Sequence, residues 1–151
     1  YDVPRYAQDL RGHFDNAVKN VKTIAPDFRT CDQVDIAIKK LEVSSASFEK
    51  SRDAALSSNK LIEDKIKKIN KGLLALEKSW IDPKGMYYGS WYRSLYVSTD
   101  PFSGYASWIL PGIQYEVEIK STDRLEEWDT RYANAILDLS KKVDQLTKTI
   151  K

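Results

Sequence analysis

Apolar residues recur every three to four positions along residues 32–80, which predicts one long helix with a continuous apolar seam. One set of positions, spaced seven residues apart, is apolar throughout: Val34, Leu41, Phe48, Ala55, Ile62, Ile69 and Leu76. The spacing keeps its phase through the turn-favouring residues Ser57-Ser58-Asn59. We therefore predict a single helix of about 49 residues.

The companion positions of this seam are apolar at both ends and polar in the middle, at Ser45, Arg52 and Asn59. These polar residues either set the register of the helix packing, or line a polar cavity or a self-association seam. The pattern is compatible with both interpretations. At the start of the helix, Thr30 and Gln33 have the spacing of a capping box. At its end, residues 82–85 (Asp-Pro-Lys-Gly) cannot continue a helix.

Two further apolar stripes at helical spacing flank this segment. One predicts a helix over residues 5–24, and the other predicts a helix over residues 123–150 that starts with Asp123 as N-cap and Glu126 at the third helical position. A helix as long as 32–80 needs partners along its length. We expect 5–24 to cover its first half and 123–150 its second. The predicted fold is therefore mainly α, an elongated antiparallel helical bundle or coiled coil.

Residues 84–121 have a different pattern, which predicts a small antiparallel β insertion of two or three strands. Apolar and polar residues alternate strictly over 113–119, as in a half-buried strand. Residues 86–97 are rich in Tyr, Trp and Val, and 106–110 forms a short third candidate. We expect all 151 residues to form one elongated domain.

This insertion also concentrates the aromatic residues. Ten of the chain's 17 aromatic residues lie between Trp80 and Tyr115, and the only charged residues over 86–115 are Arg93 and Asp100. Exposed Tyr, Trp and Arg with few other charges are typical of binding surfaces. The candidate partner-binding residues are therefore Tyr87, Tyr88, Trp91, Tyr92, Arg93, Tyr96, Phe102, Tyr105 and Trp108. The alternative is that one face of the sheet merely caps the helices and buries Trp80 and Trp128.

The chain has one His, one Cys and one Met, which argues against catalysis. Cys31 lies near a predicted helix start, where its pKa would fall, but no second Cys or His lies nearby in the sequence. Glu116 and Glu118 share a face of the predicted strand but lack any other feature of an acid–base pair. No metal-ligand spacing or cofactor motif occurs, and we expect neither a metal nor a cofactor. The net charge of +2 and the mixed charges on 32–80 argue against nucleic-acid binding.

Our preferred hypothesis is a non-enzymatic binding module, with helices that present the Tyr/Trp-rich tip to a protein, peptide or glycan, as in an extracytoplasmic sensor or adhesin. One alternative is a membrane-interacting or pore-forming protein that inserts the apolar residues 108–113. Another is a coiled-coil scaffold that forms a homo-oligomer through the heptad seam. The chain starts at Tyr1 without Met, which favours a periplasmic or secreted location.

Overall fold

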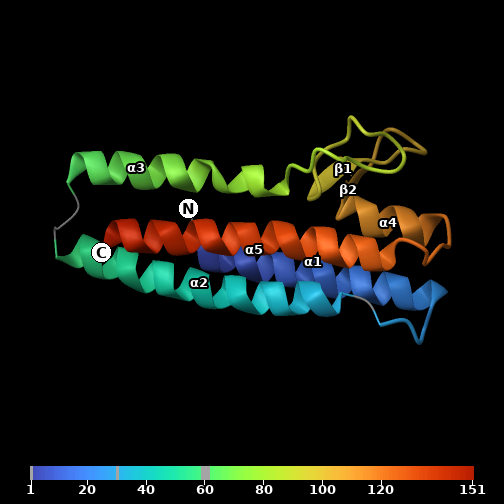
Figure 1. Ribbon diagram of the computed structural model, residues 1–151, viewed down its shortest axis with the longest axis horizontal. Helices are drawn as coiled ribbons and strands as arrows, with labels where there is room; N and C mark the ends of the chain where they lie inside the picture. Colours follow the sequence, from blue (N-terminus) through green and yellow to red (C-terminus); the bar gives the residue numbers. More distant parts are fainter. Residues whose placement is uncertain (1, 30, 59–61) are drawn as a thin grey trace.

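The computed structural model describes residues 2–29, 31–58 and 62–151, and it is mainly helical with one small sheet. The elements in chain order are α1 (Val3–Ile24), α2 (Asp32–Ser57), α3 (Glu63–Leu74), the 3₁₀ helix η1 (Leu76–Trp80), β1 (Val97–Thr99), β2 (Ser107–Ile109), α4 (Pro111–Glu118) and α5 (Leu125–Ile150). Helices α1, α2, α3 and α5 lie along the long axis of the molecule and are called the helical body below (Figure 1). The strands and α4 lie together at one end.

The prediction of one 49-residue helix is wrong, because α2 ends at Ser57 and the chain turns back into α3. The longest helices have 26 residues. At the end of α2 both the hydroxyl and the backbone amide of Ser58 donate to the Ala54 carbonyl. Asn59 lies outside the described residues. The heptad phase is kept across the turn because both α2 and α3 direct an apolar stripe toward the same partner, α5.

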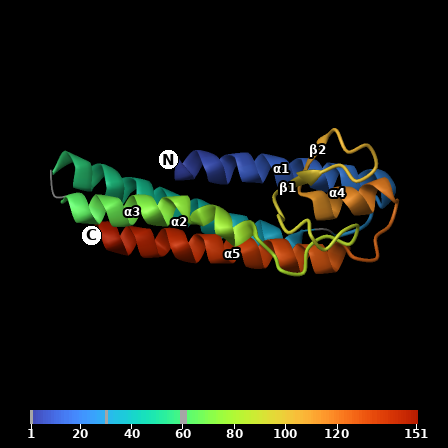
Figure 2. The same ribbon diagram turned by 90° about the horizontal axis from the view of Figure 1, so that it is seen from above.

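Helix α5 lies between α2 and α3 and contacts both (Figure 1). It runs parallel to α2, with Asp129 near the start of α2 and Ile150 near its end. It runs antiparallel to α3 and η1, because Lys65 donates to the Ile150 carbonyl and Ser79 donates to Asp138. On another side α1 runs antiparallel to α2, as expected (Figure 2). The last helix therefore covers much more of α2 than the sequence analysis predicted.

The start of α2 is capped by a residue of α5. The Asp129 carboxylate accepts hydrogen bonds from the backbone amides of Val34, at 2.9 Å, and Gln33, at 3.1 Å. The predicted partner of Gln33, Thr30, lies outside the described residues. The side chain of Gln33 instead donates to Thr130 of α5, so this side chain does not make a local capping box. The N-cap of α5 is Arg124, not Asp123, and it makes no side-chain capping bond.

The sheet is an antiparallel pair of three-residue strands in which Val97 lies opposite Ile109. Two other strand predictions are wrong. Residues 113–119 lie mostly in α4, which begins at Pro111, because Ile113 and Glu116 fall on one buried helical face three residues apart. Residues 86–96 form turns, with isolated bridges between Met86 and Gly89 and between Ser94 and Ile81.

One buried core extends through the helical body and under the sheet. It includes Trp80 and Trp128, so these two side chains are buried, as in the alternative in which the sheet caps the helices. The two described polar positions of the seam differ. The Ser45 hydroxyl is fully buried and has no hydrogen-bond partner among the described residues, whereas Arg52 forms ion pairs with Glu49 and Asp53.

Candidate protein-interaction surface

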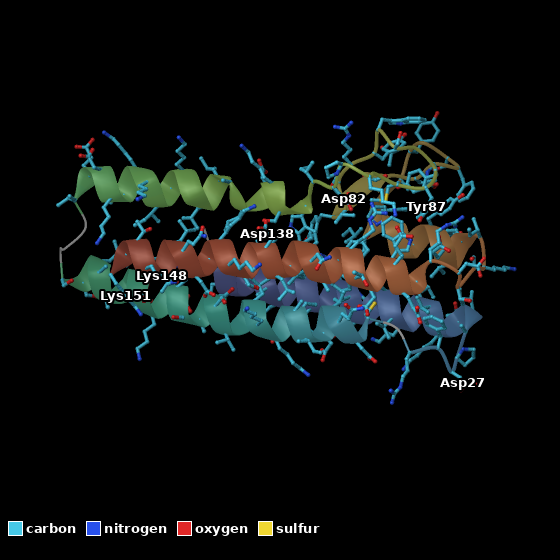
Figure 3. All side chains as sticks on the ribbon, in the orientation of Figure 1. Asp27, Asp82, Tyr87, Asp138, Lys148 and Lys151 are labelled. Carbon is cyan, nitrogen blue, oxygen red and sulfur yellow. The ribbon has the colours of Figure 1, made fainter. Side chains whose placement is uncertain are left out.

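The segment before the strands is attached to α5 by Arg131. The Nε atom of Arg131 donates to the Asp82 carboxylate at 2.8 Å, and Nη2 donates to the Gly85 carbonyl at 2.6 Å. The guanidinium also stacks on the Trp128 ring, 4.2 Å from its centre. Figure 3 places Asp82 and Tyr87 at the end of the molecule that carries the strands, opposite Lys148 and Lys151. Arg131 therefore fixes where the aromatic segment leaves the helical body.

A second set of contacts holds Tyr87 against the same helix. The Tyr87 hydroxyl and the Lys84 amine both donate to the Glu127 carboxylate, and these bonds hold the pKa of Glu127 below its usual range. The Arg124 guanidinium lies 4.2 Å from the centre of the Tyr87 ring. Tyr87 is therefore a fixed part of the junction with α5, although its side chain is exposed.

Six aromatic residues beyond this junction form a continuous group of ring contacts, which we call the aromatic tip: Tyr88, Trp91, Tyr92, Phe102, Trp108 and Tyr115. Tyr88 lies at the centre, with ring centres 5.4 Å from Tyr92 and 5.0 Å from Tyr115. Burial raises the pKa of the Tyr88 phenol. These contacts join the turns of 86–96 to the loop after β1 and to α4.

The structure divides the predicted site residues by exposure. Trp91 is 73% exposed, Phe102 65% and Tyr105 95%, and Arg93 is also exposed. Tyr88, Tyr92 and Trp108 are partly buried and support the exposed rings. Tyr96 belongs to a different group, since its ring contacts Tyr6, Trp80 and His13.

Asp100 organises the loop that presents Phe102 and Tyr105. Its carboxylate accepts from the Phe102 amide at 2.8 Å and from the Ser103 hydroxyl at 2.6 Å, which lowers the pKa of Asp100. Gly104 has a φ of 71°, in the left-handed region that favours glycine. The Asp100 amide closes the loop by donating to the Ala106 carbonyl. The exposed rings therefore project from a loop with a defined hydrogen-bond network.

The sequence analysis missed Tyr115 as a site residue. It lies on α4 and stacks nearly parallel to Phe102, with ring centres 6.1 Å apart. The strand prediction for 113–119 placed this ring on the core side of a sheet. If the segment after Pro111 is taken as a helix, Ile113 and Glu116 fall on one face and Tyr115 falls on another.

The residues weighed for catalysis do not assemble into a site. Glu116 is fully buried and pairs with Arg124, while Glu118 accepts from Gln114, so these two carboxylates do not face a common substrate position. His13 is half-buried, with its ring 5.9 Å from Tyr96. Among the described residues no cluster of three or more metal-binding side chains occurs.

Cys31 is buried, and its pKa is raised to about 12, mainly by burial and further by the nearby Asp129 and Asp32. The prediction of a lowered pKa at the helix start is therefore wrong. We expect a thiol reagent at pH 8 to modify the folded chain at least about 100-fold more slowly than the chain in urea, because the thiolate fraction is much smaller. Above pH 9 the unfolded thiol ionises first, so its contribution to stability falls as the pH rises toward 12. Equal modification rates would contradict this assignment.

The segment 108–113 does not form an exposed apolar loop. Leu110 and Ile113 are buried in the core, and α4 begins within the segment at Pro111. Two of the residues that the membrane hypothesis expects to insert are therefore buried, while Ile109 is 44% exposed. No helix in the described part of the chain is both long and apolar enough to span a membrane.

The described residues form a mainly helical domain with one small antiparallel sheet. Residues 29–144 match the transferrin receptor-like dimerisation domain family, and the chain belongs to this family. The family is non-catalytic in itself, and membership indicates a role in protein interaction or dimerisation. A search of curated proteins found no match to the chain.

Proposed function

We propose that this domain associates with a protein partner through the aromatic tip and the neighbouring Tyr105. The observation that carries the proposal is the exposure of Trp91, Phe102 and Tyr105 on a surface with few charges. Large aromatic side chains lose little conformational entropy on binding and often supply most of an interface's energy. Because the hydrogen-bonded loop and the partly buried rings already hold them, little ordering is needed when a partner binds.

The helical body serves as the support for this surface. The buried core contains residues of α1, α2, α3, α4 and α5, so we propose that residues 1–151 act as one unit. The charge of the tip also favours a protein over a nucleic acid. Arg93 is the only basic residue in 86–115, too few for contacts with a phosphate backbone.

A photo-crosslinking side chain at position 102 tests this proposal in cells that produce the protein. We expect a discrete covalent adduct with a protein, which Trp91→Ala and Tyr105→Ala each weaken by at least about 10-fold. The matched control carries the crosslinker in place of Val43, an equally exposed apolar residue on α2. An equal yield from position 43, or no effect of the two alanine variants, would refute the proposal.

A further inference from the structure

The strand β2 presents main-chain hydrogen-bonding groups on its outer edge. The Leu110 amide donates to the Tyr96 carbonyl at 2.9 Å, at the end of the ladder between β1 and β2. Hydrogen-bonded and non-bonded residue pairs alternate along an antiparallel ladder. The amides and carbonyls of Ser107 and Ile109 therefore point away from β1, toward the outer edge of β2.

The two edges of the sheet differ in how these outward groups are satisfied. On the outer edge of β1, the Val97 amide donates to the Ser94 hydroxyl at 3.2 Å, and the Ser98 hydroxyl donates to the Thr99 carbonyl at 3.0 Å. Among the described residues, no hydrogen bond engages the outward main-chain groups of β2. A strand edge with unpaired amides and carbonyls is a template for another extended chain.

The outer edge of β2 borders a groove of about 280 Å³ whose other walls are α1 and α4 (Figure 2). Asn16 and Asn20 lie one turn apart on the α1 side, and both are exposed. Gln114 of α4 contributes a third side-chain amide. All the residues that line the groove are described, and none of them is an Asp, Glu, Lys or Arg. The groove is therefore polar and carries no acidic group and no Lys or Arg charge.

The spacing of the amide groups fits an extended peptide. Asn16 and Asn20 are separated by about 6 Å along the helix axis, and Ser107 and Ile109 by about 6.8 Å along the strand. A side-chain amide, like a peptide unit, has both a donor and an acceptor. The two sides of the groove thus repeat donors and acceptors at nearly the interval of alternate residues in a strand. A charged ligand would lose its hydration here without gaining an ion pair with a carboxylate, Lys or Arg.

We propose that the protein partner of the aromatic tip lays an extended, uncharged segment of its chain along the outer edge of β2 and adds a strand to the sheet. The inference rests on the proposed function, and it names the part of the partner that binds beside the rings. Trp108 joins the two surfaces, because it borders the groove while its ring contacts Phe102. The side chain of Ile109, 44% exposed, offers the added strand an apolar contact.

An NMR titration of the isotope-labelled chain with the blocked peptide acetyl-Thr-Val-Ser-Val-Thr-amide tests this edge. We expect the amide signals of Ser107 and Ile109 to shift with a Kd of about 1 mM or lower, because main-chain hydrogen bonds supply the affinity. The same peptide methylated on every main-chain nitrogen keeps its side chains but has no main-chain donor. We expect it not to bind.

Two proline variants separate the edges of the sheet. Ile109→Pro removes an outward amide without removing a ladder bond, and we expect it to raise the Kd at least about 10-fold. The matched control Thr99→Pro removes an outward amide from β1 and leaves the Kd unchanged. The dispersion of the amide signals checks that both variants fold. If either does not, Asn20→Ala is expected to raise the Kd at least about 3-fold, with the exposed Asn134→Ala on α5 as its control.

Three results would overturn the assignment: no shift of the Ser107 and Ile109 signals up to about 5 mM peptide, equal binding of the methylated peptide, or unchanged binding in both Ile109→Pro and Asn20→Ala. Shifts caused by methyl α-glucoside in place of the peptide, if Asn20→Ala abolishes them, would assign the groove to a sugar instead. Peptide binding at this edge without a position-102 adduct would refute only the tip proposal. An adduct whose yield Ile109→Pro leaves unchanged would refute only the added strand.

Discussion

Gly112→Ala is expected to lower the free energy of unfolding by about 3 kcal/mol, measured by urea denaturation. A β-carbon at position 112 would lie 2.5 Å from two ring atoms of Trp128, well inside van der Waals contact. Gly112 is within the first turn of α4, so the cost comes from the lack of space and not from its backbone angles.

Trp128 cannot move away at low cost. It is fully buried, with the Arg131 guanidinium stacked on it and the Tyr87 ring packed edge-on against it. The control is the same substitution at Gly12, in the interior of α1, where an added β-carbon meets nothing within 4 Å. Gly12→Ala is expected to raise the free energy of unfolding by about 0.5–1 kcal/mol. Equal free energies of unfolding for the two variants would contradict the close packing of Gly112 in α4 against Trp128 in α5.

Asp129→Ala is expected to lower the free energy of unfolding by about 2–3 kcal/mol. This substitution removes the hydrogen-bond acceptor for the Val34 and Gln33 amides at the start of α2. The Val34 amide is buried and has no access to water as a substitute partner. The carboxylate also interacts favourably with the positive end of the helix dipole.

Two variants separate the capping role from general disruption at this site. Asp129→Asn keeps one acceptor and is expected to lose only about 1 kcal/mol. Thr130→Ala removes the exposed hydrogen bond from the Gln33 side chain and is expected to change stability by less than about 0.5 kcal/mol. An Asp129→Ala chain as stable as Thr130→Ala would show that α5 does not cap α2.

The sequence predicted the helical class, the approximate bounds of α1 and α5, and the small antiparallel sheet, because each depends on local periodicity or local turn residues. It did not predict the turn between α2 and α3. Heptad spacing reports only that residues such as Phe48 and Ile69 face a common apolar partner, and it holds equally for one long helix and for two helices packed on α5. The unbroken heptad spacing on both sides of Ser58 therefore did not show whether the helix continues through this position.

The same limit explains the errors around α4. Residues 113–119 alternate between apolar and polar types, which favours a strand when the segment is considered alone. In the structure Gly112 lets α4 pack directly on Trp128, and Glu116 is buried because Arg124 pairs with it at 3.0 Å. Both are contacts between α4 and the start of α5, which the pattern of residues 113–119 alone does not contain. The cap from Asp129 onto Val34 escaped prediction for the same reason.

The sequence analysis grouped the candidate residues in one region of the chain but did not place them on a surface. Composition alone placed all nine candidate residues between 87 and 108, and it could not sort them by exposure. Tertiary contacts do so, since Tyr96 is drawn toward Trp80 and Tyr87 toward Trp128, while Trp91 and Phe102 remain exposed. Our proposal is that these exposed side chains bind a protein partner, and it is tested on the protein in its native setting.

Hydroxyl-radical footprinting with mass spectrometry is the most direct test of protein association through this surface. It compares side-chain oxidation in the isolated chain with oxidation of the protein in its native extract, using Val43 and Ile36 as exposed references. The account predicts that oxidation of Trp91, Phe102 and Tyr105 falls several-fold in the extract, while oxidation of the two references stays the same. Equal oxidation of these three aromatic side chains in both samples would contradict it.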